Sequence, residues 1–217
     1  MGNGCQVQGT GTGPEQRGAA CMMLKQPRIL LVTVLCIIGL QAAPQVQAES
    51  LAKSRATADA LLDNIDQATW LSEGDGKHIV YIFFDPDCPY CHKLYESLRP
   101  LIGEMALQLR WIPVGMLAAS SPGKAAAILQ ADNPLDAFHK NEDNFNFSDK
   151  RAGGAVAPAV SMTDKTRLDL AANLSVLEEQ NLFAVPVAVF QASDGQGFMF
   201  QGAPPDKTLR QLLQYVQ

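Results

Sequence analysis

Cysteine is scarce in the chain beyond its first 48 residues. Of the five cysteines, Cys5, Cys21 and Cys36 precede residue 49, so only Cys88 and Cys91 remain after it. A single pair at this short spacing cannot staple distant segments together, which excludes the disulfide-dense scaffolds of small secreted domains. So short a loop also gives little stabilisation by restricting the unfolded chain. The pair is therefore better explained by chemistry than by stability.

A hydrophobic run long enough to span a membrane is also missing near the N-terminus. The apolar stretch Ile29–Leu40 has 12 residues, whereas a spanning helix needs about 20. Lys25 and Arg28 precede this stretch and small residues follow it up to Ala48, which is the pattern of a signal peptide. We predict that residues 22–48 form a signal peptide cleaved after Ala48, which leaves no permanent membrane anchor.

Residues 1–21 do not fit the signal-peptide pattern. They are rich in Gly and Gln and precede Met22 and Met23, where a signal peptide would naturally begin. We interpret this segment as a mis-assigned upstream start and exclude it from the fold prediction.

An excess of positive charge is absent as well. The chain carries 17 basic and 22 acidic residues, a formal net charge of −5. An acidic protein is not attracted to polyanions, so neither nucleic acid nor an anionic membrane surface is expected as a partner.

The first half of the exported chain predicts an alternation of strand and helix. Residues 49–76 are predicted to be an N-terminal helix and linker, with the helix over Leu51–Leu71 followed by turn residues. The β-branched and aromatic run His78–Phe84 predicts a fully buried strand. A helix over Cys88–Ile102 and a strand over Leu107–Val114 follow.

The second half predicts a helical block and then a hairpin with a closing helix. The predicted helices are Ser121–Ala131, Asn133–Asn144 and Asp164–Asn181, with a Gly-, Ala- and Pro-rich loop over Phe147–Ser161. The predicted strands are Val187–Gln191 and Gly197–Gln201, and the last helix is Asp206–Tyr215. This order predicts an α/β domain over residues 77–217, with a mixed central sheet flanked by helices. The arrangement is thioredoxin-like, with a helical insertion at about 120–182.

The position of the cysteine pair predicts a reactive thiol. Cys88 lies where a buried strand gives way to a helix, so free backbone N–H groups and the helix dipole favour its thiolate. A thiolate attacks a partner disulfide to form a mixed disulfide, which Cys91 then resolves. We therefore expect Cys88 to be the exposed nucleophile and Cys91 the more buried resolving group. Pro89 between them stiffens the turn.

The sequence leaves open three alternative roles for the cysteine pair. A zinc site would need two more ligands, for which His78, His92 and His139 are the available histidines. The string Cys88–His92 also matches covalent attachment of a c-type haem, although the preceding strand argues against it. A haem would need a second axial ligand, for which Met116, Met162 and Met199 are available. A passive structural disulfide is the third alternative.

A second feature is the proline at the start of a predicted buried strand, in the segment Ala184–Val187. A cis Val185–Pro186 bond would place this loop against the cysteines and leave the Val185 backbone free to pair with a substrate strand. An ordinary trans proline at a strand start is the alternative, and the sequence leaves both open.

The segment Phe84–Cys91, with sequence FDPDCPYC, resembles the active site of the DsbG and DsbC periplasmic disulfide isomerases, and DsbG more closely. The resemblance continues through Ser121–Leu129 to Gly202–Pro205 and covers about the last 150 residues. It implies a periplasmic location, a thioredoxin fold with a helical insertion, a cis proline at Pro186, and Cys88 as nucleophile with Cys91 resolving.

Two departures from these isomerases change the expectation. They carry an N-terminal dimerisation domain, whereas only 39 residues run from Glu49 up to Cys88. We therefore predict a monomer without that domain. The residue before the proline is Val185, where the isomerases have Thr; Val is reminiscent of the oxidase DsbA.

Four residues around the cysteines have weaker signals. Asp85 and Asp87 could tune the thiolate or carry protons, or could be a turn residue and a helix cap respectively. His92 could favour the Cys88 thiolate when charged, or could be a surface residue. Tyr90 is expected to shape the rim of a substrate groove.

Together these patterns predict an exported thiol–disulfide oxidoreductase that acts on the thiols or disulfides of other exported proteins. A membrane redox partner would reset the Cys88–Cys91 pair, and no metal or other cofactor is expected. The alternative function is a chaperone or substrate-binding module that uses the groove around Pro186.

Overall fold

The computed structural model describes residues 49–148 and 153–217. The predicted upstream segment 1–21 and signal peptide 22–48 lie outside the described residues. No helix within the two described ranges is long and apolar enough to cross a membrane.

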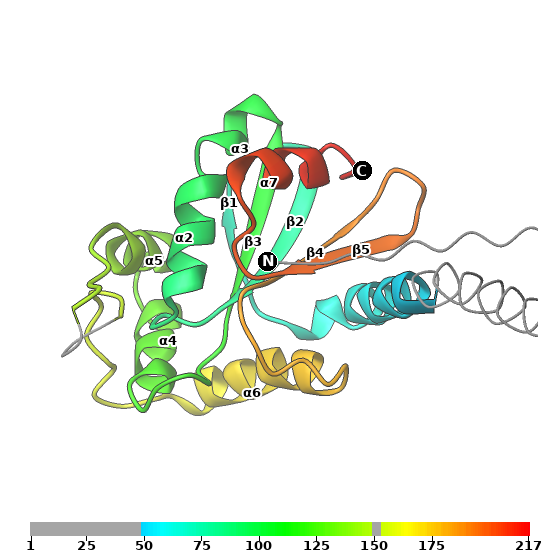
Figure 1. Ribbon diagram of the computed structural model, residues 1–217. Helices are drawn as coiled ribbons and strands as arrows, with labels where there is room; N and C mark the ends of the chain where they lie inside the picture. The colour runs from blue at the N-terminus through cyan, green and yellow to red at the C-terminus, as the bar shows by residue number, and fades with distance from the viewer. Residues whose placement is uncertain (1–48, 149–152) are drawn as a thin grey trace, which may run out of the picture. The chain divides into compact units, whose positions relative to one another are not determined.

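A mixed five-stranded sheet forms the centre of the domain (Figure 1). Its strands are β1 (Leu71–Glu73), β2 (His78–Phe84), β3 (Leu107–Pro113), β4 (Val187–Gln191) and β5 (Gly197–Gln201), in the order β1-β3-β2-β4-β5. β2 and β3 pair in parallel, whereas the other three pairings are antiparallel. This is the predicted strand–helix–strand unit joined to a hairpin.

Strand β2 lies in the middle of the sheet, which explains its unbroken apolar sequence. Val80, Ile82 and Phe84 are buried in the core on one face of the sheet, and Phe83 is buried in the core on the other. Successive side chains of a strand point to opposite faces, so a strand covered on both sides needs apolar residues at nearly every position.

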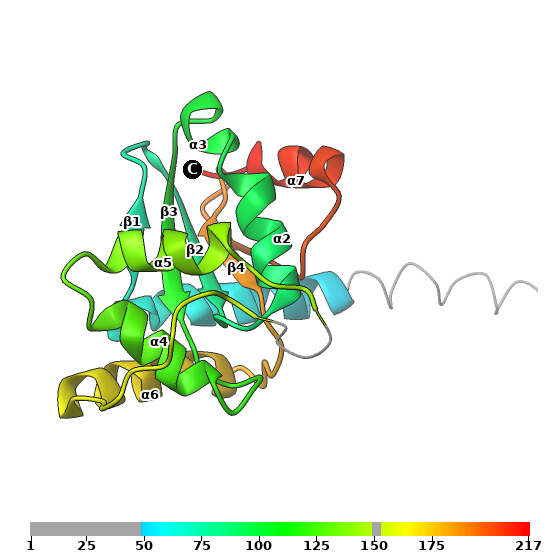
Figure 2. The same cartoon turned by 90° about the vertical axis from the view of Figure 1, so that its left-hand side faces the viewer.

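One face of the sheet, whose core includes both cysteines, is covered by a group of helices (Figure 2). They are α2 (Pro89–Leu98), α3 (Leu101–Glu104), α4 (Ser121–Leu129), α5 (Pro134–Asp143) and α7 (Asp206–Leu213). Buried side chains from these helices, including Leu94, Phe138 and Leu209, pack against Trp111 of β3 in one core.

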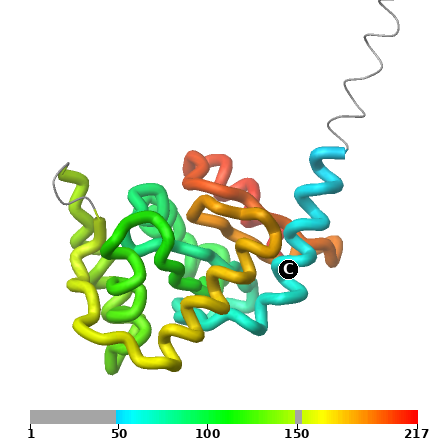
Figure 3. Tube along the Cα trace, turned by 90° about the horizontal axis from the view of Figure 1, so that it is seen from below, coloured from blue at the N-terminus to red at the C-terminus, as the bar shows by residue number. Residues whose placement is uncertain are grey.

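The opposite face is covered by the helical residues 49–63, the 3-10 turn η1 (Ile65–Gln67) and α6 (Asp164–Glu178) (Figure 3). Ala58, Leu61 and Val176 form a second core there with the strands. Asn173 of α6 is fully buried and bonds the Thr69 and Pro113 backbones, which ties α6 to the segment before β1 and to the end of β3.

The predicted N-terminal helix over Leu51–Leu71 is too long. The helix ends at residue 63, and Leu71 begins the edge strand β1. Glu73 of β1 is buried because it accepts a hydrogen bond from Trp111 Nε1 at 2.9 Å and pairs with His139 at 2.9 Å. In a sequence, a glutamate beside glycine indicates a turn. The strand at Glu73 therefore becomes evident only from its contacts with residues far along the chain.

The predicted helix over Cys88–Ile102 is divided into α2 and α3 at Arg99 and Pro100. Proline lacks the N–H that would continue the α-helical ladder, so the chain bends there. The predicted helical insertion is present between β3 and β4 as α4, α5 and α6. Side chains of Asn133 and Thr163 cap α5 and α6.

Candidate active site

The first cysteine is held at the junction of β2 and α2. β2 ends at Phe84, and Cys88 is the N-cap residue of α2 with Pro89 at its first helical position. The Cys88 N–H donates to the Asp85 carbonyl at 3.0 Å, which closes the turn between strand and helix. Since an N-cap side chain faces the free N–H groups of the first helical turn, the sulfur lies at the positive end of the helix dipole.

The surroundings of Cys88 favour its thiolate. Its Sγ accepts a hydrogen bond from the Cys91 backbone N–H at 3.3 Å. Interaction with the Cys91 thiol, followed by the backbone N–H groups of Cys91 and Tyr90, lowers the pKa of Cys88 below its ordinary value despite burial and the charge of Asp85. These groups stabilise negative charge on sulfur, which favours the thiolate form of Cys88.

The surroundings of Cys91 have the opposite effect. Burial raises the pKa of the Cys91 thiol well above its ordinary value, and the Cys88 side chain raises it further. Both cysteines are free thiols in this structure. The pKa of Cys88 is therefore lower than that of Cys91, which is the difference expected between a nucleophile and a resolving cysteine.

The prediction that Cys88 is exposed is wrong. Cys88 and Cys91 are each 2% exposed. Cys88 is covered because the loop before β4 lies against it: the Cys88 thiol donates to the Val185 carbonyl at 3.5 Å. The Val185–Pro186 peptide bond is cis, as the resemblance implied, and the Gly202 N–H holds the Pro186 carbonyl at 2.9 Å.

Asp85 is fully buried and acts as a turn residue. One carboxylate oxygen accepts hydrogen bonds from the Asp87 N–H at 2.9 Å and the Ser121 hydroxyl at 2.7 Å. The other accepts from the backbone N–H groups of Met116 and Leu117, at 2.8 and 3.0 Å. The carboxylate thus connects the active-site turn to the loop after β3.

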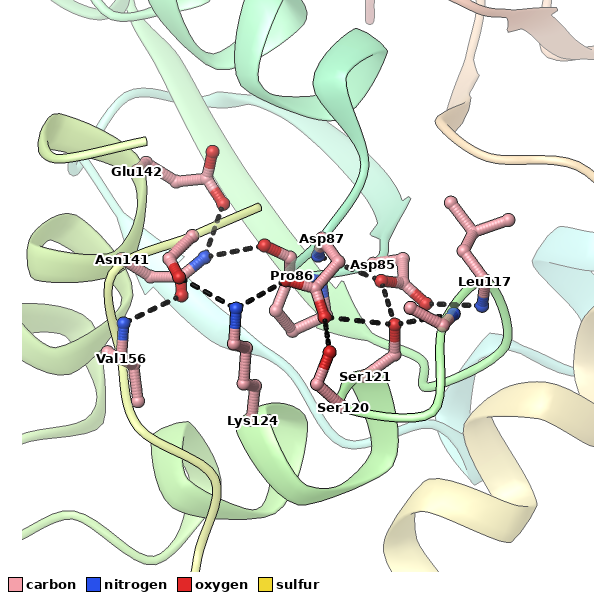
Figure 4. Close-up of polar contacts among 12 residues, drawn as sticks. Asp85, Pro86, Asp87, Leu117, Ser120, Ser121, Lys124, Asn141, Glu142 and Val156 are labelled. Carbon is pink, nitrogen blue, oxygen red and sulfur yellow. Dashed lines mark hydrogen bonds and ion pairs between the residues drawn. The ribbon is translucent and has the colours of Figure 1, made fainter. Parts of the chain in front are cut away.

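Asp87 is not the helix cap, because Cys88 occupies that position. Its carboxylate instead forms an ion pair with Lys124 of α4 and accepts a hydrogen bond from the Ser120 hydroxyl at 2.6 Å (Figure 4). The Lys124 ammonium also donates to the Gly154 carbonyl at 2.7 Å. Asp87 therefore anchors the cysteine turn to the helical insertion.

Asn141 of α5 holds the same turn from the other side. Its side-chain amide donates to the Pro86 carbonyl at 3.0 Å and to Glu142 Oε1 at 3.0 Å, and its amide oxygen accepts from the Val156 N–H (Figure 4). The Gly154 N–H also donates to Pro86. A Cβ atom on Gly154 would lie 2.0 Å from the Asn141 amide, so only glycine fits this contact.

His92 is buried rather than exposed, with 7% of its surface accessible. Its Nδ1 lies 3.4 Å from Oε2 of Glu142, a residue of α5 that is 1% exposed. Its Nε2 lies 3.4 Å from the carboxylate of Glu96, and its ring stacks on Phe145 with centroids 4.8 Å apart. The facing Glu142 raises the pKa of His92, and burial raises the pKa of Glu142.

Tyr90 lies exposed in the cysteine turn, with 58% of its surface accessible. The Lys93 ammonium lies 5.2 Å from its ring centroid. The position is compatible with the predicted rim of a substrate groove.

Two of the histidines considered for a zinc site, His78 and His139, lie apart from the cysteines. His139 pairs with Glu73, and His78 begins β2, whose other end leads to Cys88. Across residues 49–148 and 153–217, no three His, Cys, Asp or Glu side chains are grouped to hold a metal ion.

Sequence reasoning missed Lys124, Asn141 and Glu142. Each lies in the helical insertion, more than thirty residues after the cysteines. The only local signal is a polar residue in an otherwise apolar setting, such as Lys124 before Ala125–Leu129. A pattern of this kind does not show which residue the polar side chain contacts.

Comparison with curated proteins gives two similar chains. The chain is 31% identical over 160 residues to the thiol:disulfide interchange protein DsbG of Pseudomonas aeruginosa, covering 72% of this chain and 59% of that protein. It is 29% identical over 150 residues to DsbG of Escherichia coli K12, covering 67% and 57% respectively. The chain therefore spans less than two thirds of the length of both relatives.

The fold is also found in solved structures. The catalytic domain of Proteus mirabilis ScsC superposes with a TM-score of 0.56 at 17% identity, over 72% of this chain and 96% of that one. The family model for the thioredoxin-like domain matches residues 65–217, which include the whole sheet and both cysteines. The chain belongs to the thioredoxin-like domain family, as the order of its elements predicted.

Proposed function

We propose that the protein is a periplasmic thiol–disulfide oxidoreductase that acts on cysteines of other exported proteins through Cys88 and Cys91. The observation that carries this proposal is the position of Cys88: its Sγ, at the N-cap of α2, accepts the Cys91 N–H at 3.3 Å and lies 3.5 Å from the Val185 carbonyl beside the cis proline. In agreement with this position, the pKa of Cys88 is lowered, whereas that of Cys91 is raised. A passive disulfide has no need of such a difference, but a nucleophile and a resolving group do.

The exchange proceeds in two balanced steps. The Cys88 thiolate attacks one sulfur of a substrate disulfide, so a Cys88–substrate disulfide forms and a substrate thiolate leaves. The Cys91 sulfur, after losing its proton, attacks Cys88 Sγ, which forms the Cys88–Cys91 disulfide and releases the second substrate thiolate. Run backwards, the same steps donate a disulfide to a substrate dithiol. A membrane redox partner would then restore the starting state.

The loop at Pro186 supports a site for substrate backbone. The Val185 carbonyl contacts the Cys88 thiol at 3.5 Å, so a substrate cysteine bonded to Cys88 would lie beside this loop. An extended substrate segment could then pair with the Val185 backbone, as strands do at an open edge. Tyr90 would border the same segment.

The names of the two relatives support thiols and disulfides as the substrate class. Both are called thiol:disulfide interchange proteins. We extend this activity to the present chain because the cysteines, the cis proline and the fold that positions them are all present.

Trapping of mixed disulfides tests the proposal. In Cys91→Ser, Cys88 still attacks but cannot be released, so covalent adducts with exported proteins should accumulate and dissolve on reduction. Cys88→Ser and the double variant are the matched controls and should form none. If Cys91→Ser accumulated no adducts, Cys91 would not be the resolving cysteine.

A further inference from the structure

Part of one sheet face is only partly covered by the described helices. It belongs to the face that packs against residues 49–63 and α6, and Figure 1 shows both at the level where β2 and β3 end. Phe83 and Ile112 are paired near those ends and are fully buried. Tyr81 and Arg110 are paired on the same face, two residues earlier in each strand, and are only partly buried. The first halves of the two strands therefore present side chains to the solvent.

Arg110 is held in place on this surface by aromatic side chains. Its guanidinium carbon lies 5.0 Å from the centroid of the Trp70 ring and 5.1 Å from that of the Tyr81 ring. The two rings meet edge to face, with their centroids 5.6 Å apart. The guanidinium also donates to the Tyr81 hydroxyl at 2.5 Å and to Gln108 Oε1 at 3.1 Å. The position of this cation is therefore set by contacts within the protein, before any ligand binds.

Arg110 is the arginine that pairs with no carboxylate within residues 49–148 and 153–217. The other arginines of these ranges each pair with an aspartate or glutamate: Arg55, Arg99, Arg167 and Arg210. A planar guanidinium binds a carboxylate through two parallel hydrogen bonds. Since Tyr81 and Gln108 engage one N–H each, the remaining N–H groups on Nη1 and Nη2 can bind a carboxylate from outside the chain.

A cavity of about 380 Å³ adjoins the same tyrosine. Its lining includes the apolar side chains of Leu62, Ile65 and Ile79. The charged side chains that line it are Lys77 and Asp63, whose charges are opposite. The cavity therefore suits an uncharged apolar side chain, whereas Arg110, on the other side of Tyr81, suits an anion.

We propose that Trp70, Tyr81 and Arg110, together with the adjoining cavity, form a docking surface for an acidic segment of a partner polypeptide. A Glu or Asp carboxylate of the segment pairs with Arg110, and a neighbouring apolar side chain enters the cavity beside Ile79. Charge complementarity selects this occupant, because the protein is acidic as a whole and offers an unpaired cation here. Trp, Tyr and Arg are also the residue types that contribute most to binding at protein interfaces.

The docking surface and the cysteines lie on opposite faces of the sheet. Cys88 and Cys91 belong to the core that contains Trp111, whereas Trp70 and Tyr81 pack against the other core. A partner bound at the docking surface therefore leaves the cysteine turn uncovered. The inference does not depend on the proposed exchange reaction, and the two can be tested separately.

Selection from a phage library of short random peptides without cysteine tests the proposal. The wild-type protein is one bait, and Arg110→Ala is the other. We expect the wild-type protein to enrich peptides that carry Asp or Glu next to an apolar residue, and Arg110→Ala to enrich none of them. Enrichment of no peptide, of peptides without a carboxylate, or of the same peptides by both baits would overturn the proposal.

Fluorescence anisotropy of a labelled, enriched peptide gives the size of the effect. We expect Arg110→Ala to weaken binding about 30-fold, as the loss of an interface hot spot does. Arg110→Lys should weaken it less, because the charge remains but the planar fork is lost. Arg167→Ala, which removes an exposed arginine of α6, is the matched control and should bind the peptide as wild type does. Equal affinities of Arg110→Ala and wild type would contradict the proposal.

The wild-type protein decides the question even if Arg110→Ala does not fold. A peptide with Gln in place of its Glu should bind about 30-fold more weakly, and added salt should weaken binding of the Glu peptide. Equal binding of the two peptides would overturn the proposal. Cys88→Ser should bind the Glu peptide as wild type does, and loss of binding there would place the site at the cysteines instead. Self-association that is lost in Arg110→Ala, measured by sedimentation, would identify the surface as an interface between two copies and contradict an acidic partner.

Discussion

Three buried carboxylates lie around the cysteine turn, and they differ in the number of hydrogen bonds that they accept. Asp85 accepts from four donors, and Asp87 accepts from Lys124 and the Ser120 and Ser121 hydroxyls. Glu142, by contrast, receives one hydrogen bond, from Asn141, within the described part of the chain. A carboxylate saturated with backbone and hydroxyl donors holds the turn in place, whereas Glu142 is held by one hydrogen bond and by its ion pair with His92. The comparison separates the carboxylates that fix the cysteine turn from the one that pairs with a titratable side chain.

The largest expected effect is the loss of stability in Asp85→Ala, which removes a carboxylate that holds the cysteine turn. The substitution leaves the buried N–H group of Asp87 and the part-buried N–H groups of Met116 and Leu117 without their acceptor, which should lower the free energy of unfolding by about 3 kcal/mol. Urea denaturation measures this, with Asp75→Ala on the exposed turn before β2 as the control. A loss no greater than in the control would show that Asp85 does not hold the turn.

The next effect concerns the ion pair between α4 and the turn. Lys124→Met leaves Asp87, whose side chain is 3% exposed, buried without its cation, and should cost about 3 kcal/mol of unfolding free energy. Adding Asp87→Asn removes the stranded charge and should recover part of the loss. Denaturation of both single variants and the double variant measures the coupling; strictly additive losses would contradict a direct pair.

The smallest stability effect is expected for Glu142→Gln, about 1 kcal/mol or less, since only one hydrogen bond to Glu142 is altered. Its pH dependence is more informative. The folded-state pKa values of Glu142 and His92 are raised above 4.5 and 6.5. Their stabilising contributions are therefore complete below those values and are lost as the pH rises through the folded-state values.

The wild-type protein should thus become less stable as the pH rises from acid to alkaline values. Glu142→Gln should lose less stability over the same range, because it removes the contribution of Glu142 and reduces that of His92. Unfolding free energies measured across this range check the sign. A steeper loss in Glu142→Gln than in wild type would mean that the pKa of the carboxyl group is not raised by burial.

The framework could be predicted largely from sequence because its signals are local. The apolar run His78–Phe84 and the turn at Gly195 specify β2 and the β4–β5 hairpin with the observed bounds. The cysteine spacing and the strand before it indicated the reactive pair. Each of these predictions depends on residues that are neighbours in the chain.

The polar support of the site could not be predicted because it is made of distant contacts. Lys124 meets Asp87 across 37 residues, and Asn141 meets Pro86 across 55. The exposure of Cys88 was predicted wrongly for the same reason, since its cover comes from Val185, 97 residues later. Helical periodicity shows that a position faces inward, but not which polar group it meets there.

The most direct test of the central claim is the pH dependence of alkylation at each cysteine in the reduced protein, read by mass spectrometry. Cys88 should become reactive below its ordinary thiol pKa of 9.0, and Cys91 only well above it. This result would establish the opposite tuning on which the proposed exchange depends. If both cysteines titrated together near 9.0, the site would lack the asymmetry of a nucleophile and its resolving partner, and the proposed mechanism would be wrong.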